Sequence, residues 1–449
     1  MTESDRRTVL VLTYEYPPSA GGGVQRVAKL TRYLPEHGFD PVVLAAEPVS
    51  GRPQDEELAA EVADVPETRL PARNVSAGFA RLLAGPKRLA GSGVASGAHA
   101  DVAASEAATG ARARGRAGSR IPLSTRLSRW VEFDDASRWS NAAVRVGADL
   151  VRTHDCAAVV ASGPPFSTLA AGAWIANTTG VPFVADMRDP WLENASAYWP
   201  TRWHRRRAQR VAVSVLGSAA AVVAVSEPIA EEAATYGART LRVIPNGFDG
   251  EDMVPREVDP SAPLRLAFMG TFYAATDPTD LLTAFAEAAE RNAEARDAQL
   301  DIVGPERASV RATVERLGIS DRVRFLGYLS HSDALRVIAA ADAGIVLVSD
   351  VPGSQAVYTA KLFEYLGMRM PVLAMVPEDG AAASLVRRAR AGWVVPTGDV
   401  EEAVETIARM ASAKSGGGLD VDMDDEVVRG LERREQAGEF AAVLRGVIE

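Results

Sequence analysis

The sequence predicts an α/β protein built from two doubly wound domains, each with a parallel sheet. Short apolar runs of strand length alternate with segments whose apolar residues recur at helical spacing, and this alternation begins again in the second half of the chain. The length of 449 residues and the hydrophobic fraction of 47% suit two large domains with sizeable cores.

Five apolar runs in the first half have the composition of strands buried on both faces. These runs are Thr8–Thr13, Pro41–Ala45, Ala157–Ala161, Pro182–Ala185 and Ala220–Val225. Apolar side chains at helical spacing predict a helix over Val24–Pro35, between the first two strands, and Gly38 lies close to its end.

The second half repeats this pattern of strands and helices. Its strands are Leu264–Met269, Gln299–Val303, Val323–Phe325, Ala343–Val348 and Pro371–Ala374. Its helices include Pro278–Arg291, Ala308–Leu317, Ser332–Ala341, Ala360–Leu366 and Val400–Ala413.

Turn-forming residues cluster over Ile244–Asp249, where the two halves join. We therefore expect an N-terminal domain over residues 1–250 and a C-terminal domain over residues 251–430, with Pro245, Asn246 and Gly247 as the hinge. A last helix over residues 431–449 would pack back on the N-terminal domain.

A stretch of Ala, Gly and Ser interrupts the N-terminal domain. Between Gly91 and Arg120, 20 of 30 residues are of these three types, and such a composition buries too little apolar surface to offset chain entropy. The stretch predicts an insertion over about residues 85–122 that is mobile or weakly helical.

Charge and cysteine content exclude several classes of protein. A net charge of −10 argues against a general nucleic-acid binder, because phosphate contacts need a surplus of cations. The single cysteine, Cys156, excludes internal disulfides and cysteine-based metal clusters. We find neither a signal-peptide pattern nor an apolar run of about 20 residues, so we expect a soluble, cytoplasmic chain.

The loop Tyr14–Arg26 follows the first predicted strand and opens the first helix. Its glycines, Gly21 to Gly23, let the backbone approach a ligand closely, and a helix N-terminus offers free N–H groups to an anion. A flexible connection is the alternative. Because open α/β sheets bind ligands at the carboxyl ends of their strands, the position favours a binding loop.

Two carboxylates flank an arginine at the end of the strand Pro182–Ala185, as Asp186, Arg188 and Asp189. Such a cluster is costly to bury, so it is either a structural ion pair or a functional group. In the functional interpretation Asp186 or Asp189 accepts a proton or a substrate hydroxyl. Arg188 then meets phosphate or acceptor charge through its planar fork.

A third motif occupies Gly353–Leu373. Lys361 and Glu364 are three residues apart on the predicted helix Ala360–Leu366 and share one face. A surface ion pair is the alternative to a binding site. The apolar neighbours of both residues leave little room for a fully solvated face.

Together these motifs resemble the family-4 glycosyltransferases, whose GT-B fold sets two Rossmann-like domains across a cleft. The resemblance covers nearly the whole chain except Gly91–Arg120. The matching segments are YPPSAGGG near the start, SGPPFSTLAA at 162–171, FVADMRDPW at 183–191, VSEP at 225–228, IPNGFD at 244–249, LDIVG at 300–304, VRFLGYLSHSDAL at 323–335 and KLFEYLGMRMPVLA at 361–374.

The resemblance implies transfer of a sugar from a nucleotide-diphosphate donor to a glycan, lipid-linked or small-molecule acceptor, with retention of anomeric configuration, as in polysaccharide biosynthesis. Gly22 and Gly23 would approach the donor. Glu364 would bind the ribose, while Gly353 and Ser354 would offer N–H groups to the donor sugar or phosphate. No metal or other cofactor is implied, so protein cations and helix dipoles would stabilise the leaving diphosphate.

The chain departs from the family pattern at several of these positions. Ala356 replaces the first of two glutamates, and Thr271 stands where an arginine is common. Thr276 lies near the place of a lysine, and Asp186 lies near the place of a histidine. Lys361 would then be the main replacement cation.

A cationic segment with one tryptophan, Trp203, lies on another predicted helix. Its cations are Arg205, Arg206, Arg207 and Arg210. The segment is either a solvated helix face or a peripheral contact with the inner membrane surface, where arginines meet anionic headgroups. Lipid-linked acceptors, common among relatives, favour the contact.

Two other classes share the two-domain plan. A non-catalytic nucleotide-sugar-binding scaffold agrees with Ala356 and Thr271 but leaves Lys361, Glu364 and the glycine loop unexplained. A nucleotide-sugar epimerase or glycan phosphorylase has the same fold, and fold alone does not separate these activities.

Overall fold

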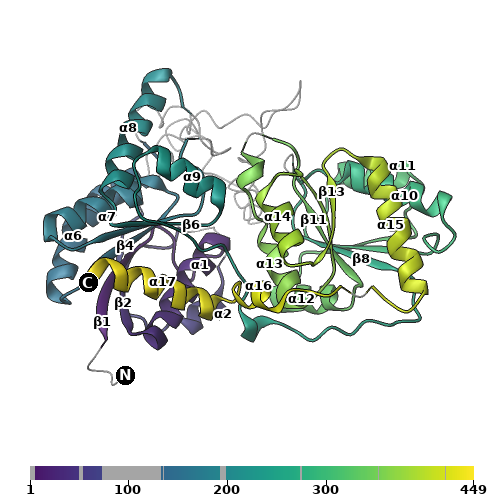
Figure 1. Ribbon diagram of the computed structural model, residues 1–449, viewed down its shortest axis with the longest axis horizontal. Coiled ribbons are helices and arrows are strands. Elements are labelled where there is room, and N and C mark those ends of the chain that lie inside the picture. Colours follow the sequence, from purple (N-terminus) through teal and green to yellow (C-terminus); the bar gives the residue numbers. More distant parts are fainter. Residues whose placement is uncertain are drawn as a thin grey trace, which may run out of the picture. The chain divides into compact units, whose positions relative to one another are not determined.

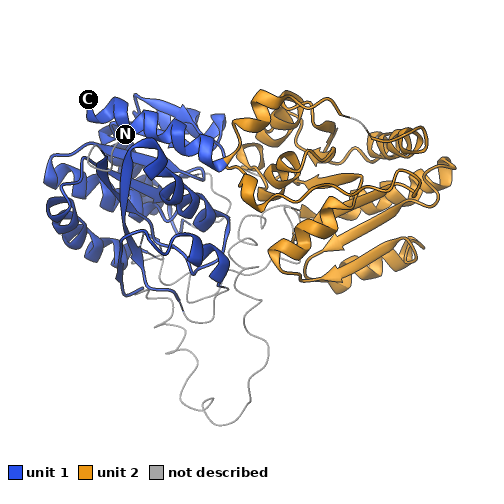
Figure 2. Ribbon diagram, turned by 90° about the horizontal axis from the view of Figure 1, so that it is seen from below, with its two compact units in different colours: residues 1–245, 433–449 blue, residues 246–432 orange. Residues whose placement is uncertain are grey.

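The computed structural model describes residues 6–49, 54–72, 133–134, 136–192, 199–273, 276–351, 353–419 and 421–449. The predicted insertion over residues 85–122 lies outside these ranges. The chain forms two compact units, residues 1–245 with 433–449 and residues 246–432 (Figure 2). The boundaries expected from the sequence lie after residues 250 and 430.

The N-terminal unit contains a parallel seven-stranded sheet in the order β3-β2-β1-β4-β5-β6-β7. Its strands are β1 (Arg7–Leu12), β2 (Phe39–Ala46), β3 (Glu67–Leu70), β4 (Ala158–Gly163), β5 (Phe183–Met187), β6 (Ala221–Ala224) and β7 (Leu241–Val243). Val9 of β1 lies beside Pro41 on one side and Ala158 on the other. The first strand therefore lies inside the sheet.

Helices cover this sheet (Figure 1). They are α1 (Gly22–Tyr33), α2 (Glu56–Glu61), α6 (Ser137–Thr153), α7 (Phe166–Thr179), α8 (Arg202–Ser218), α9 (Glu227–Thr235) and α17 (Arg433–Ile448), with the 3-10 turn η2 (Leu34–His37). The last helix, α17, returns from the far end of the chain and packs against α1.

The C-terminal unit contains a parallel six-stranded sheet in the order β10-β9-β8-β11-β12-β13. Its strands are β8 (Arg265–Met269), β9 (Gln299–Val303), β10 (Val323–Gly327), β11 (Ala343–Leu347), β12 (Val372–Val376) and β13 (Gly392–Pro396). Its helices are α10 (Thr279–Arg291), α11 (Ala308–Arg316), α12 (His331–Ala339), α13 (Ala360–Gly367), α14 (Ala381–Arg388), α15 (Val400–Ser415) and α16 (Asp425–Arg429), with the 3-10 turns η4 (Gly250–Asp252) and η6 (Ser354–Ala356).

Burial of the central strands on both faces explains their continuous apolar sequences. Val9 to Leu12 of β1 are fully buried, and Leu266 and Ala267 of β8 are too. Burying one such valine or leucine side chain contributes about 1.5–3 kcal/mol. In the C-terminal unit two apolar clusters divide the sheet's side chains between its faces, with Leu266 in one and Ala267 in the other.

Candidate active site

Both sheets reverse their strand order next to a sequence motif. The reversal lies between β1 and β4 in the N-terminal unit and between β8 and β11 in the C-terminal unit. Open α/β sheets bind ligands beyond the carboxyl ends of the strands at such a point. The glycine loop follows β1 and the Gly353–Leu373 motif follows β11, so each motif lies at the binding edge of its sheet.

Gly21 to Gly23 form the uncapped start of α1. Gly21 has a φ of 138°, and Gly22 is the first helical residue. No side chain caps this helix, and its first turn carries no acidic residue. The helix dipole and the N–H groups of the first turn therefore favour an anion here, as the predicted donor-binding role of Gly22 and Gly23 requires.

The guanidinium of Arg188 lies directly against Gly23. A β-carbon on Gly23 would lie 1.6 Å from Nη1 of Arg188, so this arrangement requires glycine. Nη2 of Arg188 donates a hydrogen bond to the carbonyl of Pro164, and Nε has no hydrogen-bond partner in the described part of the chain. Burial lowers the pKa of Arg188, while the carboxylates of Asp186 and Asp189 oppose that shift.

Asp186 is completely buried at the end of β5, and its carboxylate is already engaged. Arg26 donates to it from Nε at 3.0 and 3.1 Å and from Nη2 at 2.8 Å, and Oγ of Ser162 donates at 2.7 Å. Burial alone would raise the pKa of Asp186, but the charge and hydrogen bonds of Arg26 and Ser162 hold it below its usual value. This geometry favours a positioning role for Asp186 over the predicted contact with a substrate proton or hydroxyl.

Arg26, the ion-pair partner of Asp186, was not singled out by sequence reasoning. It lies on the buried face of α1, three residues after Gly23, and is 4% exposed. The available signal was its place between the core positions Val24 and Val27. An arginine there needs a carboxylate partner, because an unpaired buried charge is costly.

Asp189 is partly exposed and lies in the loop after β5. Contacts of the residues that follow it hold this loop in place. The carboxylate of Glu232 accepts hydrogen bonds from the N–H groups of Trp191 and Leu192 at 2.8 and 3.0 Å. The buried ring of Trp191 stacks on Phe166 with centroids 4.5 Å apart. These contacts hold Asp189 at the carboxyl edge of the sheet, where a ligand can reach it.

In the C-terminal unit the side chain of Lys361 lies over Gly270, directly after β8. A β-carbon on Gly270 would lie 2.2 Å from Cε and 2.6 Å from Nζ of Lys361. The buried hydroxyl of Tyr365 accepts a hydrogen bond from the N–H of Met269 at 3.3 Å, which fixes α13 against the end of β8. The fold thus brings the predicted cation to the binding edge of the sheet.

Lys361 does not pair with Glu364, which was the alternative interpretation of their spacing. Lys361 forms no ion pair within the described residues. Oε1 of Glu364 lies 3.6 Å from Nε2 of His331, and the glutamate side chain is only 13% exposed. His331, at the start of α12, is therefore a neighbour of the candidate ribose-binding carboxylate that the motifs did not reveal.

Gly353 and Ser354 form a tight turn after β11. Gly353 has a φ of 85°, and the N–H of Ser354 donates to the carbonyl of Val351 at 2.9 Å. The N–H of Ser354 is thus already engaged in this structure, although the sequence suggested it for the donor. The nearby start of α13 has no side-chain cap at Thr359 and no acidic residue in its first turn, so its dipole favours an anion.

Two family models match the chain, one in each half. Residues 87–252 match the model described as Glycosyltransferase Family 4, and residues 263–413 match the model described as Glycosyl transferases group 1. The chain belongs to the family-4 glycosyltransferases. It is therefore an enzyme of glycosyl transfer.

Solved structures match this glycosyltransferase over almost its whole length. The lipopolysaccharide outer core galactosyltransferase WaaB in its apo form is 13% identical, with a TM-score of 0.59 and coverage of 98% of this chain and 99% of that chain. Sucrose-phosphate synthase from Thermosynechococcus elongatus is 14% identical, with a TM-score of 0.57 and coverage of 98% and 97%. Anabaena HepE in complex with UDP is 14% identical, with a TM-score of 0.54 and coverage of 97% and 94%. At these identities the likeness confirms the predicted fold. No curated protein sequence gives a match.

The threonines that replace cations of the glycosyltransferase pattern shape the turn after β8. Oγ1 of Thr276 donates to the carbonyl of Thr271 at 2.9 Å and accepts from the N–H of Tyr273 at 3.1 Å. Ala356 is buried in the 3-10 turn η6. None of these residues carries charge, whereas Lys361 places a cation against Gly270 at the end of β8.

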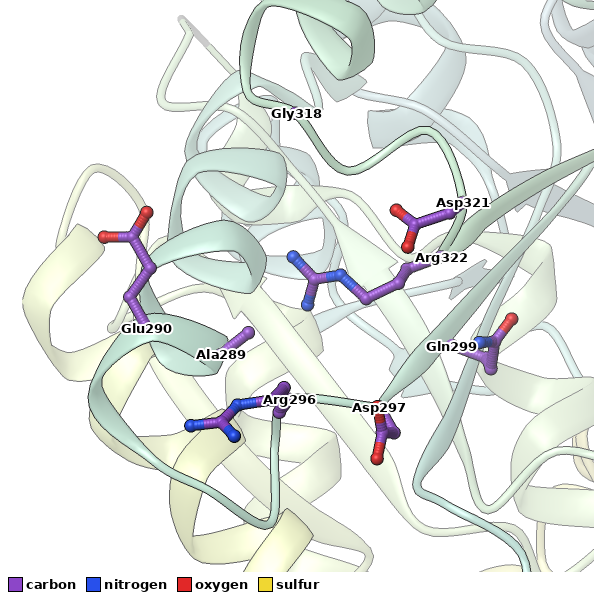
Figure 3. Close-up of a pocket in the computed structure, with 8 residues that line it drawn as sticks. All are labelled: Ala289, Glu290, Arg296, Asp297, Gln299, Gly318, Asp321 and Arg322. Atoms are coloured by element: carbon purple, nitrogen blue, oxygen red, sulfur yellow. The ribbon is translucent and has the colours of Figure 1, made fainter.

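The same unit contains a hollow of about 370 Å³, whose lining residues Figure 3 shows. Gln299, the first residue of β9, and Arg322, directly before β10, place it at the amino ends of these strands. Its charged lining is mixed and includes Glu290, Arg296, Asp297, Asp321 and Arg322. Ligand binding in open α/β sheets occurs at the opposite edge, so we do not assign this hollow to the active site.

The predicted cationic segment forms the start of α8. Trp203 is 59% exposed, and Arg205, Arg206, Arg207 and Arg210 are exposed as well. The helix contains no Asp or Glu. Among the described helices, α8 included, none is long and apolar enough to cross a bilayer.

Proposed function

We propose that this glycosyltransferase moves a sugar from a nucleotide-diphosphate donor to a glycan or lipid-linked acceptor, with retention of anomeric configuration. The observation that carries the proposal is the ammonium group of Lys361 against Gly270, beside the uncapped start of α13. A lysine with no carboxylate partner in the described residues, next to a positive helix end, suits a diphosphate.

The chemistry of transfer needs positive charge at this place. As the bond between the anomeric carbon and the donor phosphate oxygen breaks, negative charge grows on the leaving diphosphate. Lys361 stabilises that charge, and Glu364 holds the ribose hydroxyls. The acceptor hydroxyl oxygen forms the new bond to the anomeric carbon, and its proton leaves with the diphosphate. We expect this step to need no metal ion, so a chelator should leave turnover unchanged.

In this proposal the N-terminal unit binds the acceptor and also contacts the donor. Gly22 and Gly23 present N–H groups to donor oxygens, and Arg188 adds a charge at the same turn. Asp189 is the more accessible carboxylate of the Asp–Arg–Asp cluster. We therefore propose that Asp189 binds the hydroxyl group of the acceptor. Asp186 supports the site through Arg26.

A panel of UDP-, GDP-, TDP- and ADP-sugars tests the proposal. UDP-sugars come first, because one solved structure of this fold, Anabaena HepE, contains UDP. We expect one donor to raise the melting temperature by mass action and to release its nucleoside diphosphate. Binding without release would indicate a scaffold, and interconversion of the sugar without acceptor would indicate an epimerase. The anomeric configuration of the product tests retention.

We also propose that α8 contacts an anionic membrane surface, where a lipid-linked acceptor would be found. Arg206 and Arg210 are four residues apart and share a helix face, and Trp203 and Arg207 form the adjacent row. None of these arginines forms an ion pair in the described part of the chain. Uncompensated arginines beside an exposed tryptophan suit the headgroup region.

Vesicle sedimentation tests the membrane contact. Vesicles containing phosphatidylglycerol should bind the protein, and pure phosphatidylcholine vesicles should not. The Arg206→Glu/Arg210→Glu variant should lose this binding. As a charge-matched control, Arg336→Glu/Arg409→Glu should keep it, since these exposed arginines are already paired with carboxylates. Equal binding of both variants would rule out α8 as the contact.

A further inference from the structure

The side chain of Arg26 joins three segments of the N-terminal unit. Besides its hydrogen bonds to Asp186, it donates from Nη1 to the carbonyl of Pro245 at 2.9 Å. Pro245 is the last residue of this unit before the chain enters the other one. Asp186 is two residues from Arg188, whose guanidinium lies against Gly23. The first turns of α1 and the end of β5 are therefore joined by two contacts, one between Arg26 and Asp186 and one between Gly23 and Arg188.

A contribution to stability does not by itself explain why the buried ion pair of Arg26 and Asp186 is present. The side chains of Arg26 and Asp186 are 4% and 1% exposed. Removing two ions from water costs free energy that their attraction repays only in part, and apolar residues of similar volume often stabilise a core equally well. What a guanidinium supplies in addition is one fixed geometry, because its planar fork must meet Asp186 and Pro245 together.

We propose that Arg26 is a positioning residue of the glycosyltransferase. It holds the glycine turn of α1 and Arg188 in a single arrangement, which the proposed function of that turn requires. A displacement of about 1 Å at reacting groups can lower a rate by about 10²-fold. Loss of Arg26 should therefore lower kcat. The donor KM should change less than kcat, because in our proposal Lys361 and Glu364 of the C-terminal unit hold the diphosphate and ribose, and only the glycine turn contacts the donor from this unit.

The test removes both charges together. Arg26→Met alone leaves the buried charge of Asp186 without a partner and should lower the melting temperature strongly. Arg26→Met/Asp186→Asn relieves that defect at nearly constant volume. The matched control is Lys29→Met/Glu61→Gln, since Lys29 is also buried on α1 and its Nζ lies 2.6 Å from Glu61. Glu61 also pairs with the partly exposed Arg32 at 2.5 Å, so the control removes at least as much ion pairing as the test variant.

We would measure melting, kcat, donor KM and amide hydrogen exchange over residues 14–24. In the double variant of Arg26 and Asp186 we expect melting above that of Arg26→Met, a kcat about 10²-fold lower with a smaller change in KM, and faster exchange at the glycine turn. Arg26→Lys should recover only part of the rate. The control should keep kcat and the exchange of the turn.

A well-folded double variant with wild-type kcat, or with the turn exchanging as in the control, would overturn the inference. A wild-type enzyme that turns over no nucleotide sugar would instead contradict the proposed function. Hydrogen exchange still decides the role of Arg26 in that case, because it needs no donor.

Discussion

The side chain of Lys361 occupies the space beside Gly270 that any other residue at position 270 would fill with its own β-carbon. That β-carbon would lie 2.2 Å from Cε of the lysine. The φ of Gly270, 134°, is also one that other residues rarely adopt. Position 270 therefore requires glycine both for backbone conformation and for the placement of the ammonium group.

Gly270→Ala should reduce donor binding and turnover more than its cost in stability explains. Backbone strain of this kind costs about 1–3 kcal/mol, and the added methyl must also displace Lys361. Thermal melting and donor titration measure the two effects. The control is Gly398→Ala, because Gly398 also has a positive φ, 89°, but no atom within 4 Å of its β-carbon position. Equal donor affinity in the two folded variants would contradict the proposed role of Lys361.

Lys361→Met should lower kcat by about 10²–10³-fold at saturating donor, the loss expected when one preorganised transition-state contact is removed. Melting should change little, since Lys361 has no ion-pair partner in the described residues. Lys361→Arg should recover part of the rate, because it keeps the charge on a bulkier group. If the Met variant retained most of its turnover, another cation would have to stabilise the diphosphate, with Arg188 the first to test.

Gly23→Ala should destabilise the protein, whereas Gly22→Ala should not. A methyl group on Gly23 would collide with the guanidinium of Arg188, while a β-carbon on Gly22 meets no atom within 4 Å. Alanine in a helix also restricts the unfolded chain, which stabilises by about 0.4–1 kcal/mol where the backbone permits it. Urea unfolding of the two variants makes the comparison. Similar losses in both would mean that Arg188 moves aside without cost.

The order of elements was predictable from sequence wherever strands are buried on both faces. The apolar runs that became β1, β4, β8 and β12 show this. The edge strands β3, β7 and β13 were missed, because partly exposed strands lack a continuous apolar run. Motif position likewise predicted which strand ends carry the candidate site residues.

Contacts between distant segments were not predictable. The spacing of Lys361 and Glu364 suggested an ion pair, but the fold sends Lys361 to Gly270 and Glu364 toward His331. Arg26 is another example, because its need for a carboxylate does not say which one. Periodicity describes one element at a time, whereas such pairings depend on how neighbouring elements pack.

Glu364→Ala should weaken donor binding while the protein stays folded. A lost hydrogen bond to a charged group typically costs about 1.5–3 kcal/mol. Thermal melting of the variant shows how much the fold depends on this side chain, which is 13% exposed and lies 3.6 Å from His331. Calorimetric titration of the donor that the wild type uses, beside Glu315→Ala on the exposed face of α11 as control, provides the measurement. Unchanged affinity would remove Glu364 from the binding site.

Asp186 should make stability depend on pH in the acid range. Its pKa is lowered in the folded protein, because Arg26 and Ser162 outweigh the effect of burial. The unfolded carboxyl titrates near its ordinary value of about 3.9, so between that value and the lower folded one the unfolded state binds more protons. The stabilisation from this carboxylate is then complete above about pH 5 and is lost as the pH falls through the folded pKa.

Asp186→Asn removes the titrating carboxyl. Comparing the variant with wild type therefore separates the contribution of Asp186 to acid unfolding from that of the other carboxyl groups. The variant should be less stable than wild type at neutral pH, since Arg26 loses its charged partner. That difference in unfolding free energy should shrink as the pH falls below about 4, because the unfolded wild-type carboxyl binds a proton there while the folded one is still charged, which destabilises only the wild type. Urea unfolding of both proteins at a series of pH values gives the difference directly, and the contributions of carboxylates common to both cancel. A difference that stays constant down to the acid limit of folding would mean that Asp186 has no lowered pKa.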